Sequence, residues 1–193
     1  AGRRHPERDL VLAEAFAAPP FAARRFDVVF CSGVFNLRLG NNEDFVRRAY
    51  AEKVPMVGIC FGHQIIAQAL GGKVERFDKG WAVGPTDYDF GGETITMNAW
   101  HRDQVTKRPP MAEPVACNEF CENAALVYGD RAFTVQAHPE FADDFIDGLM
   151  RTRGKGLVPD EVMAAASARL GQPNSSTAIA DRIADFFTQT RNS

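Results

Sequence analysis

The sequence predicts an α/β protein, a three-layer sandwich around a mostly parallel central sheet, with a small β-rich insert. Two strand–loop–helix units, a middle stretch of short strands and a helical last third indicate this fold. Strands that alternate with helices pair in parallel, because each helix carries the chain back across the sheet. The 193 residues suffice for one core and show no break in composition. We therefore expect a single domain over residues 1–193.

The first third of the chain carries the strand–loop–helix units. An initial helix is expected to stop at Pro19 and Pro20, which cannot continue it. Asn41 supplies a cap for the next helix, and Gly71 and Gly72 close the one after. The expected elements are a helix over residues 7–18, a strand over 26–31, a helix over 41–53, a strand over 55–60 and a helix over 62–70.

The β-rich insert and the closing helices occupy the rest of the chain. Gly91 and Gly92 indicate a hairpin turn inside the insert. Expected strands cover residues 74–77, 83–90, 94–97, 126–128 and 133–135, and expected helices cover 141–153, 159–170 and 175–188. Residues 154–193 are thus expected to form a helical C-terminal extension.

The composition argues against a nucleic-acid-binding, membrane-spanning or zinc-binding protein. A net charge of -3 and a pI near 5.8 give no reason to expect a nucleic-acid partner. No stretch approaches the roughly 18 apolar residues of a membrane span, and no apolar signal segment follows the first residues. Cys117 and Cys121 have no second pair that would complete a zinc site. We expect a cytoplasmic protein that uses no metal or cofactor and contacts no membrane.

The most informative motif is VGICFGHQ at residues 57–64. Cys60 ends an apolar run, and Gly58 and Gly62 stand two residues before and after it. A nucleophile elbow turns from strand to helix at a strained residue, so its neighbours must be nearly free of side chains. Cys60 is therefore a candidate nucleophile. Its place at the start of a helix, near a histidine, predicts a lowered pKa.

A second motif, VQAHPE at residues 135–140, supplies a base and an acid. His138 ends a predicted strand and Pro139 keeps it extended, so Glu140 can point the same way and orient the imidazole. The alternative is a strand that ends in a His-Pro turn, with Glu140 capping the next helix. These residues alone leave both interpretations open.

Attack of a thiol on a carboxamide creates an oxyanion, which needs N–H donors about 3 Å away. The backbone N–H of Phe61 is one candidate, as in other elbows. The N–H of Gly33 or Val34, at the end of the neighbouring strand, is the expected second donor.

Other polar and aromatic residues lie within or near these motifs. His101 and Asp103 form an alternative base and acid, ranked below the pair in the second motif. His63 is interpreted as a helix-start residue, because the geometry of a base comes first. Trp81 is expected in the core and Trp100 at the rim of a pocket.

Together the two motifs resemble those of the class I (triad) glutamine amidotransferases. The likeness is strongest to the stand-alone group similar to GMP synthase, which includes plant γ-glutamyl peptidases. It runs over about residues 26–145 and takes in residues 65–72 (IIAQALGG), 79–84 (KGWAVG) and 100–105 (WHRDQV). The resemblance implies the flavodoxin-like fold of that family.

The resemblance also implies roles for individual residues. Cys60 would be the nucleophile, His138 the general base and Glu140 the group that orients it. The residues implied to hold the glutamine are Gln64 and a turn formed by Trp100 and His101. The implied reaction passes through a γ-glutamyl thioester on Cys60 and releases ammonia, either free or to an unknown acceptor on a separate synthetase or acceptor subunit.

Two further hypotheses stay open. A γ-glutamyl peptidase or hydrolase that acts on γ-glutamyl conjugates uses the same triad. Family members ordinarily open with a β-strand, yet no apolar run precedes Leu10, so we expect that strand to be missing. Its loss would expose neighbouring backbone, and the chain could then be a catalytically silent subunit that binds a partner. A homo-oligomer is compatible with the sequence.

Overall fold

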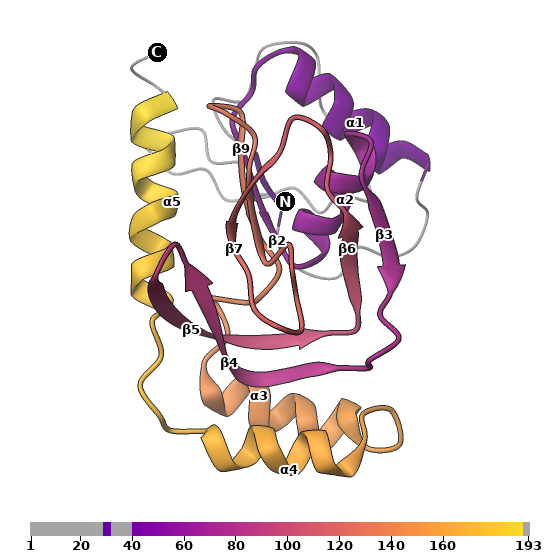
Figure 1. Cartoon of the computed structure of the whole chain (residues 1–193), viewed down its shortest axis with the longest axis vertical. Coiled ribbons are helices and arrows are strands. Elements are labelled where there is room, and N and C mark those ends of the chain that lie inside the picture. The colour runs from indigo at the N-terminus through magenta and orange to yellow at the C-terminus, as the bar shows by residue number, and fades with distance from the viewer. Residues whose placement is uncertain (1–28, 32–39, 191–193) are drawn as a thin grey trace, which may run out of the picture.

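The central sheet of the protein has five strands in the order β1-β2-β9-β8-β7 (Figure 1). The structure is a computed structural model, which describes residues 29–31 and 40–190. The predicted helix over residues 7–18, the start of the 26–31 strand and the expected loss of a first strand lie outside the described residues. The five strands are β1 (Val29–Cys31), β2 (Met56–Ile59), β9 (Ala132–Val135), β8 (Ala125–Val127) and β7 (Glu113–Ala116).

This sheet is mixed, which corrects the prediction of a mostly parallel one. β1, β2 and β9 run parallel, but β8 is antiparallel to β9 and β7 is antiparallel to β8. The reason is the connection between β8 and β9, a tight turn in which the N–H of Tyr128 donates to the carbonyl of Ala132 at 2.9 Å. So short a connection reverses the chain, whereas a parallel pair needs a long crossover.

The two strand–helix units are present as predicted. α1 (Gly40–Ala51) follows β1, and α2 (Phe61–Ala69) follows β2. Side chains of β2 alternate between the faces of the sheet, so Met56 packs with α1 and α2 while Val57 and Ile59 pack on the other side. Burial on both faces explains why this strand is apolar along its whole length.

The predicted β-rich insert is also present, as two antiparallel ribbons. β3 (Lys73–Arg76) pairs with β6 (Asp103–Lys107), and β4 (Ala82–Phe90) pairs with β5 (Glu93–His101). Gly91 and Gly92 have φ of 68° and 98° at the tip of the β4–β5 hairpin, a region that glycine adopts freely. β6 and β7 had no clear sequence signal, and Pro114 within β7 argues against a strand on pattern alone.

The β4–β5 hairpin and α5 (Ser176–Thr190) together cover the second face of the sheet. Tyr88 and Met97 from the hairpin and Ile179 from α5 are almost fully buried in one core with β2 and β9. One outer layer is therefore helical, and the other combines a hairpin with a helix.

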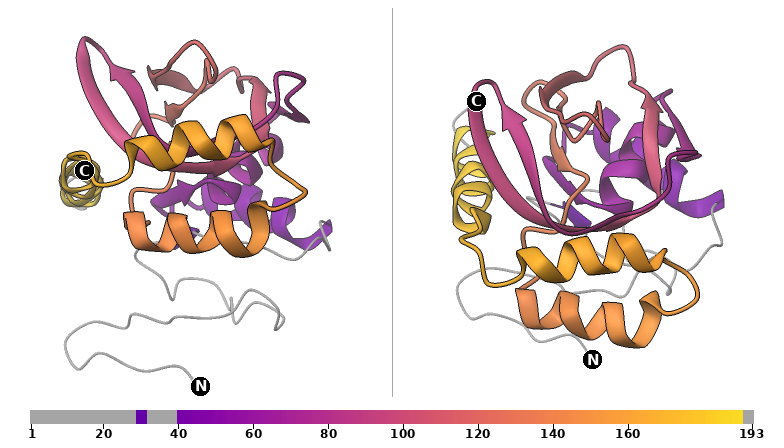
Figure 2. Two further views of the ribbon diagram at one scale, coloured as in Figure 1. Left: turned by 90° about the horizontal axis from the view of Figure 1, so that it is seen from below. Right: turned by 60° about the horizontal axis from the view of Figure 1, so that its bottom comes forward.

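The remaining helices pack on the outer side of the hairpin. α3 (Asp143–Leu149) continues into a π-helix, η1 (Met150–Gly154), and α4 (Asp160–Arg169) lies beside them under β4 (Figure 2). The helices predicted over residues 141–153, 159–170 and 175–188 are thus confirmed, the first as two pieces. In the part of the chain that the structure describes, no helix is both long enough and apolar enough to cross a membrane.

Candidate active site

Cys60 occupies the sharp turn between β2 and α2. Its φ of 51° and ψ of -102° are strained for a residue with a side chain, at a cost of about 1–3 kcal/mol. Two backbone bonds hold the turn: the N–H of Cys60 donates to the carbonyl of Val135 at 2.9 Å, and the N–H of Gln64 donates to the carbonyl of Cys60 at 3.0 Å. Strain that persists because its surroundings enforce it is a mark of a functional site.

Gly58 is required at this elbow by close packing. A Cβ at residue 58 would lie 2.6 Å from the backbone carbon of Gly62, 2.7 Å from its oxygen and 2.8 Å from the nitrogen of His63. Backbone atoms of a helix cannot move aside as the end of a side chain can. The sequence-based interpretation of this glycine as part of an elbow agrees with the structure.

His138 reaches the same end of the sheet from the neighbouring strand. Ile59 at the end of β2 pairs with Val135 at the end of β9, so the residues that follow both strands lie at one edge. Nδ1 of His138 lies 2.9 Å from Oε1 of Glu140. The His138 side chain is 5% exposed and that of Glu140 is 35% exposed, so the imidazole is buried and the carboxylate is more open. This contact is the one predicted for an orienting carboxylate.

Two further residues hold His138. Its backbone N–H donates to the carbonyl of Asn98 on β5 at 2.7 Å, and its ring stacks on Phe141 with 3.9 Å between centroids and 3° between planes. The side-chain amide of Asn98 donates to the carbonyl of Phe141 and to Oδ1 of Asp143, both at 2.9 Å. Asn98 therefore fixes both ends of the turn after β9. No sequence pattern had singled it out.

The thiol of Cys60 is not activated in the way the sequence predicted. Burial raises its pKa to about 12, and the negative charge of Glu140 adds to the rise, as does that of Asp103. The N–H of Phe61 and the side-chain amide of Gln136 act in the opposite direction. The expected lowering by the helix dipole and a histidine is outweighed, because desolvation disfavours the thiolate. The raised pKa favours the thiol form of Cys60 at neutral pH.

This raised pKa predicts the order of cysteine labelling. With iodoacetamide at pH 7.5, exposed Cys117 should react at least about tenfold faster than Cys60, because the thiolate is the reactive form. The Cys60 rate should still be rising at pH 10, since a raised pKa moves deprotonation to higher pH. Peptide mass spectrometry gives both rates. Labelling in urea, where both thiols are exposed, is the control, and faster labelling of Cys60 in the folded protein would contradict the prediction.

Gln64 and Gln136 form a buried pair of amides beside the sulfur. Nε2 of Gln64 donates to the carbonyl of Asp103 at 2.8 Å and to Oε1 of Gln136 at 3.2 Å. Nε2 of Gln136 lies 3.7 Å from Sγ of Cys60. Sequence reasoning gave Gln136 no role, although it stands in the VQAHPE motif two residues before His138.

His63 and His101 are buried and neutral. Burial lowers the pKa of His63 to about 3 and that of His101 to about 4. Nδ1 of His63 lies 2.8 Å from Oγ1 of Thr134, which fits a structural residue at the start of a helix. The pKa of His101 is also lowered by His138, so these two rings lie close enough to interact.

Trp100 and His101 do not form the predicted turn. Both belong to β5, so their side chains point to opposite faces. His101 approaches Phe120, with 6.4 Å between ring centroids, whereas Trp100 lies 5.8 Å from Trp81 in a cluster with the α3 and α4 layer. The structure places His101 on the side of His138 and Trp100 away from it.

Of the two predicted donors of the oxyanion hole, the structure describes only one. Phe61 is the first residue of α2 and its N–H favours the thiolate of Cys60, so this donor lies beside the sulfur. Gly33 and Val34 lie outside the described residues.

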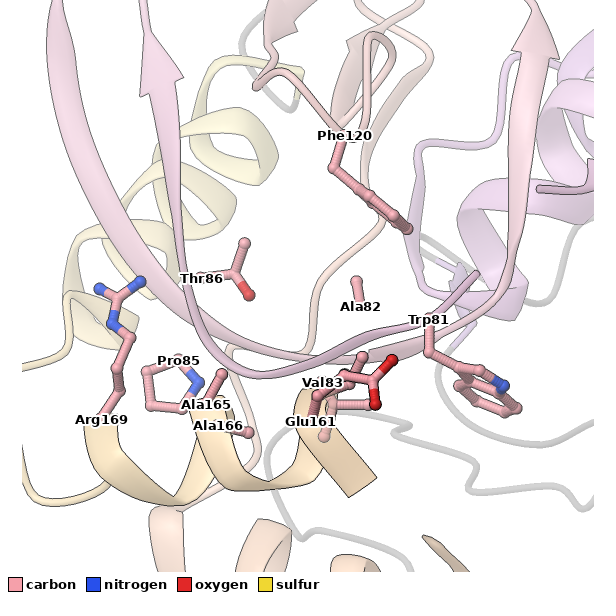
Figure 3. Close-up of a pocket in the computed structure, with 11 residues that line it drawn as sticks. Trp81, Ala82, Val83, Pro85, Thr86, Phe120, Glu161, Ala165, Ala166 and Arg169 are labelled. Atoms are coloured by element: carbon pink, nitrogen blue, oxygen red, sulfur yellow. The ribbon is translucent and has the colours of Figure 1, made fainter. Parts of the chain in front are cut away.

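A cavity of about 370 Å³ lies between β4 and α4 (Figure 3). Trp81 and Arg169 stand at its two ends, and Phe120 faces it from the side opposite α4. Its lining contains none of the residues predicted for catalysis. Ala82 on β4 pairs with His101 on β5, so the cavity lies one strand away from the candidate site.

Comparison with known proteins identifies the family. The model of the glutamine amidotransferase class-I family matches residues 14–147, which include both motifs. The chain belongs to the class I glutamine amidotransferase family, and the predicted resemblance is confirmed.

Relatives within this family carry different names. A glutamine-hydrolyzing GMP synthase subunit of Pyrococcus abyssi is 32% identical over 142 residues, 66% of this chain and 76% of that protein. Gamma-glutamyl peptidase 2 of Arabidopsis thaliana is 32% identical over 127 residues, 59% of this chain and 51% of that protein. For three curated relatives, the Arabidopsis protein among them, the chain spans between 45% and 58% of their length.

A solved structure supports the fold. The crystal structure of a glutamine amidotransferase from Thermotoga maritima superposes with a TM-score of 0.64, covering 87% of this chain and 79% of that chain. The identity is 19%, so this match concerns the fold alone.

Proposed function

We propose that this chain hydrolyses the γ-carboxamide of glutamine through a γ-glutamyl thioester on Cys60. The observation that carries the proposal is the strained cysteine of the elbow, next to a strand, β9, that leads into the hydrogen-bonded pair of His138 and Glu140. Membership of the family supports the choice of a γ-glutamyl amide as the substrate class.

Because the pKa of Cys60 is raised, the first step of the proposed reaction requires a base to remove the proton of the thiol. His138 takes the proton from the thiol as the sulfur attacks, and then passes it to the departing ammonia. Glu140 holds Nδ1 of the ring, which leaves Nε2 to carry that proton. The N–H of Phe61 and that of Gly33 or Val34 are the proposed donors to the oxyanion. Water activated by His138 then releases glutamate.

We propose that two of the predicted substrate residues line the wall of the substrate site. His101 lies near the base, and Gln64 lies in the amide pair beside the sulfur. Trp100 is the weakest of the three predicted substrate contacts, because it packs with Trp81 on the other face of β5.

The ammonia would either be released or pass to a separate synthetase or acceptor subunit. The Pyrococcus relative is named as one subunit of GMP synthase, which favours a partner of this kind. The name of the Arabidopsis relative favours a second function, hydrolysis of γ-glutamyl conjugates by the same triad.

The acyl-enzyme tests both functions. The protein is incubated with glutamine or with a panel of γ-glutamyl peptides, quenched in acid and analysed by intact-mass and peptide mass spectrometry. We expect a glutamyl adduct on Cys60 that is absent from Cys60→Ala, together with release of glutamate.

The relative turnover of glutamine and of γ-glutamyl peptides distinguishes the two proposed functions. Faster hydrolysis of conjugates than of glutamine would replace the first function by the second. No adduct and no turnover with any substrate would overturn both, and would favour a catalytically silent subunit that binds a partner.

A further inference from the structure

Gln136 is a buried polar side chain whose amide lies against the sulfur of the nucleophile. The residue is fully buried directly after β9, and its Nε2 lies 3.7 Å from Sγ of Cys60, within the range of an N–H···S hydrogen bond. Buried amides cost free energy unless their hydrogen bonds are made. Both ends of this amide are engaged, since its Oε1 accepts a hydrogen bond from Gln64.

The direction of this hydrogen-bond chain is set by the backbone. The carbonyl of Asp103 can only accept, so it fixes the NH₂ end of Gln64 toward itself at 2.8 Å. The same NH₂ group then requires the oxygen end of Gln136, because two facing NH₂ groups cannot bond. With its oxygen bound to Gln64, Gln136 must present its own NH₂ group to Cys60. A backbone carbonyl on β6 thereby determines which group faces the sulfur.

The sulfur also faces charged groups from other elements. The carboxylates of Glu140, after β9, and Asp103, on β6, both oppose a thiolate at Cys60. The N–H of Phe61 on α2 and the amide of Gln136 favour it. A neutral donor in this position can stabilise the sulfur as its proton leaves without adding a competing base.

We propose that Gln136 is a positioning residue for the nucleophile, which donates a hydrogen bond to Sγ of Cys60, and that Gln64 braces it through the carbonyl of Asp103. This inference rests on the proposed function, because it assumes that Cys60 is the reacting group. The hydrogen bond holds the sulfur in one orientation and stabilises the negative charge that develops on it during attack.

Gln136→Met tests the donor, because methionine keeps the length of the side chain and removes the amide. The matched control is Gln104→Met on β6: Gln104 is 3% exposed, and its Nε2 has no hydrogen-bond partner among the residues that the structure describes. Alkylation of Cys60 by iodoacetamide is followed from pH 8 to 10.5 in each protein. Thermal unfolding checks that the variants are folded.

We expect Gln136→Met to lower the alkylation rate of Cys60 roughly tenfold at a fixed pH, which corresponds to a displacement of the profile by about one pH unit to higher pH. Gln104→Met should stay within about twofold of the wild type, since it also replaces a buried amide but removes no hydrogen bond to the thiol. A Gln136→Met profile that coincides with that of Gln104→Met would overturn the proposal.

Gln64→Met tests the brace, and it keeps the proposal falsifiable if Gln136→Met does not fold. It should displace the profile in the same direction by a smaller amount. The double variant of Gln64 and Gln136 should behave like Gln136→Met alone, because residues acting in series are not additive. Additive effects of the two substitutions, or no effect of Gln64→Met, would contradict the proposal that Gln64 positions Gln136.

The alkylation readout needs no substrate, so it is independent of the proposed function. A displaced profile in a protein that forms no acyl-enzyme supports the hydrogen bond and removes the proposed function alone. An unchanged profile in a protein that does form the acyl-enzyme removes the positioning role alone.

Discussion

Replacing His138 by glutamine is expected to lower kcat for γ-glutamyl amide hydrolysis by about 10²–10⁴-fold, the usual contribution of a general acid–base group. The loss should be large in this protein because Cys60, with a pKa raised to about 12, is not ionised before the base acts. Steady-state kinetics with the substrate that gives the acyl-enzyme measures the effect. Circular dichroism verifies that the variant is folded.

His101→Gln is the matched comparison, because His101 with Asp103 is the alternative base and acid. Burial lowers the pKa of His101 to about 4, which makes it a weak base at neutral pH. We expect this variant to raise KM and to keep kcat within about tenfold of the wild type, as for a residue that contacts substrate. A larger loss of kcat in His101→Gln than in His138→Gln would exchange the roles of the two histidines.

Gly58→Ala should destabilise the fold by about 2–4 kcal/mol, at or above the usual cost of overpacking. The added Cβ would lie 2.6–2.8 Å from three backbone atoms of Gly62 and His63, so either α2 must shift or β2 must bend. Urea unfolding monitored by circular dichroism gives the free energy of unfolding. Activity should fall as well, since α2 begins directly after Cys60, the proposed nucleophile.

Gly148→Ala is the control for a glycine-to-alanine change. This glycine lies in α3, and a Cβ there would meet nothing within 4 Å. The substitution should be neutral or stabilise the protein by up to about 1 kcal/mol, because glycine is a poor helix former. Equal midpoints for the two variants would show that the elbow tolerates a Cβ at residue 58.

The elbow was predictable because its signal is local. Gly58, Cys60 and Gly62 are close in sequence; a Cβ at residue 58 would meet the backbone of α2, and Cys60 has the strained φ of an elbow. The hairpin at Gly91 was predictable for the same reason. The contact between His138 and Glu140 was predicted from their spacing along an extended segment, but the structure makes it across a turn, in which the backbone N–H of Phe141 donates to the carbonyl of His138 at 3.2 Å.

Features that depend on distant parts of the chain were not predictable. The direction of β8 depends on a short turn, and β7 pairs with it although its own sequence contains a proline. The pKa of Cys60 depends on its burial against a core to which distant elements such as β4, β5 and α5 contribute, which no local motif reveals. By contrast, strand periodicity would have separated Trp100 from His101, had the segment been recognised as a strand rather than a turn.

The hydrogen bond between the carbonyl of Asn98 and the N–H of His138 ties the proposed base to the β4–β5 hairpin. Related proteins can have a longer or shorter hairpin at its tip, near Gly91. The tip lies at the opposite end of the hairpin from Asn98, so such a change leaves the hydrogen bond to His138 in place. A slip of one residue along β5 would instead turn the Asn98 side chain to the other face and release the turn after His138. Insertions in this family should therefore accumulate at the tip of the hairpin, while the number of residues between the positions of Asn98 and His101 stays constant.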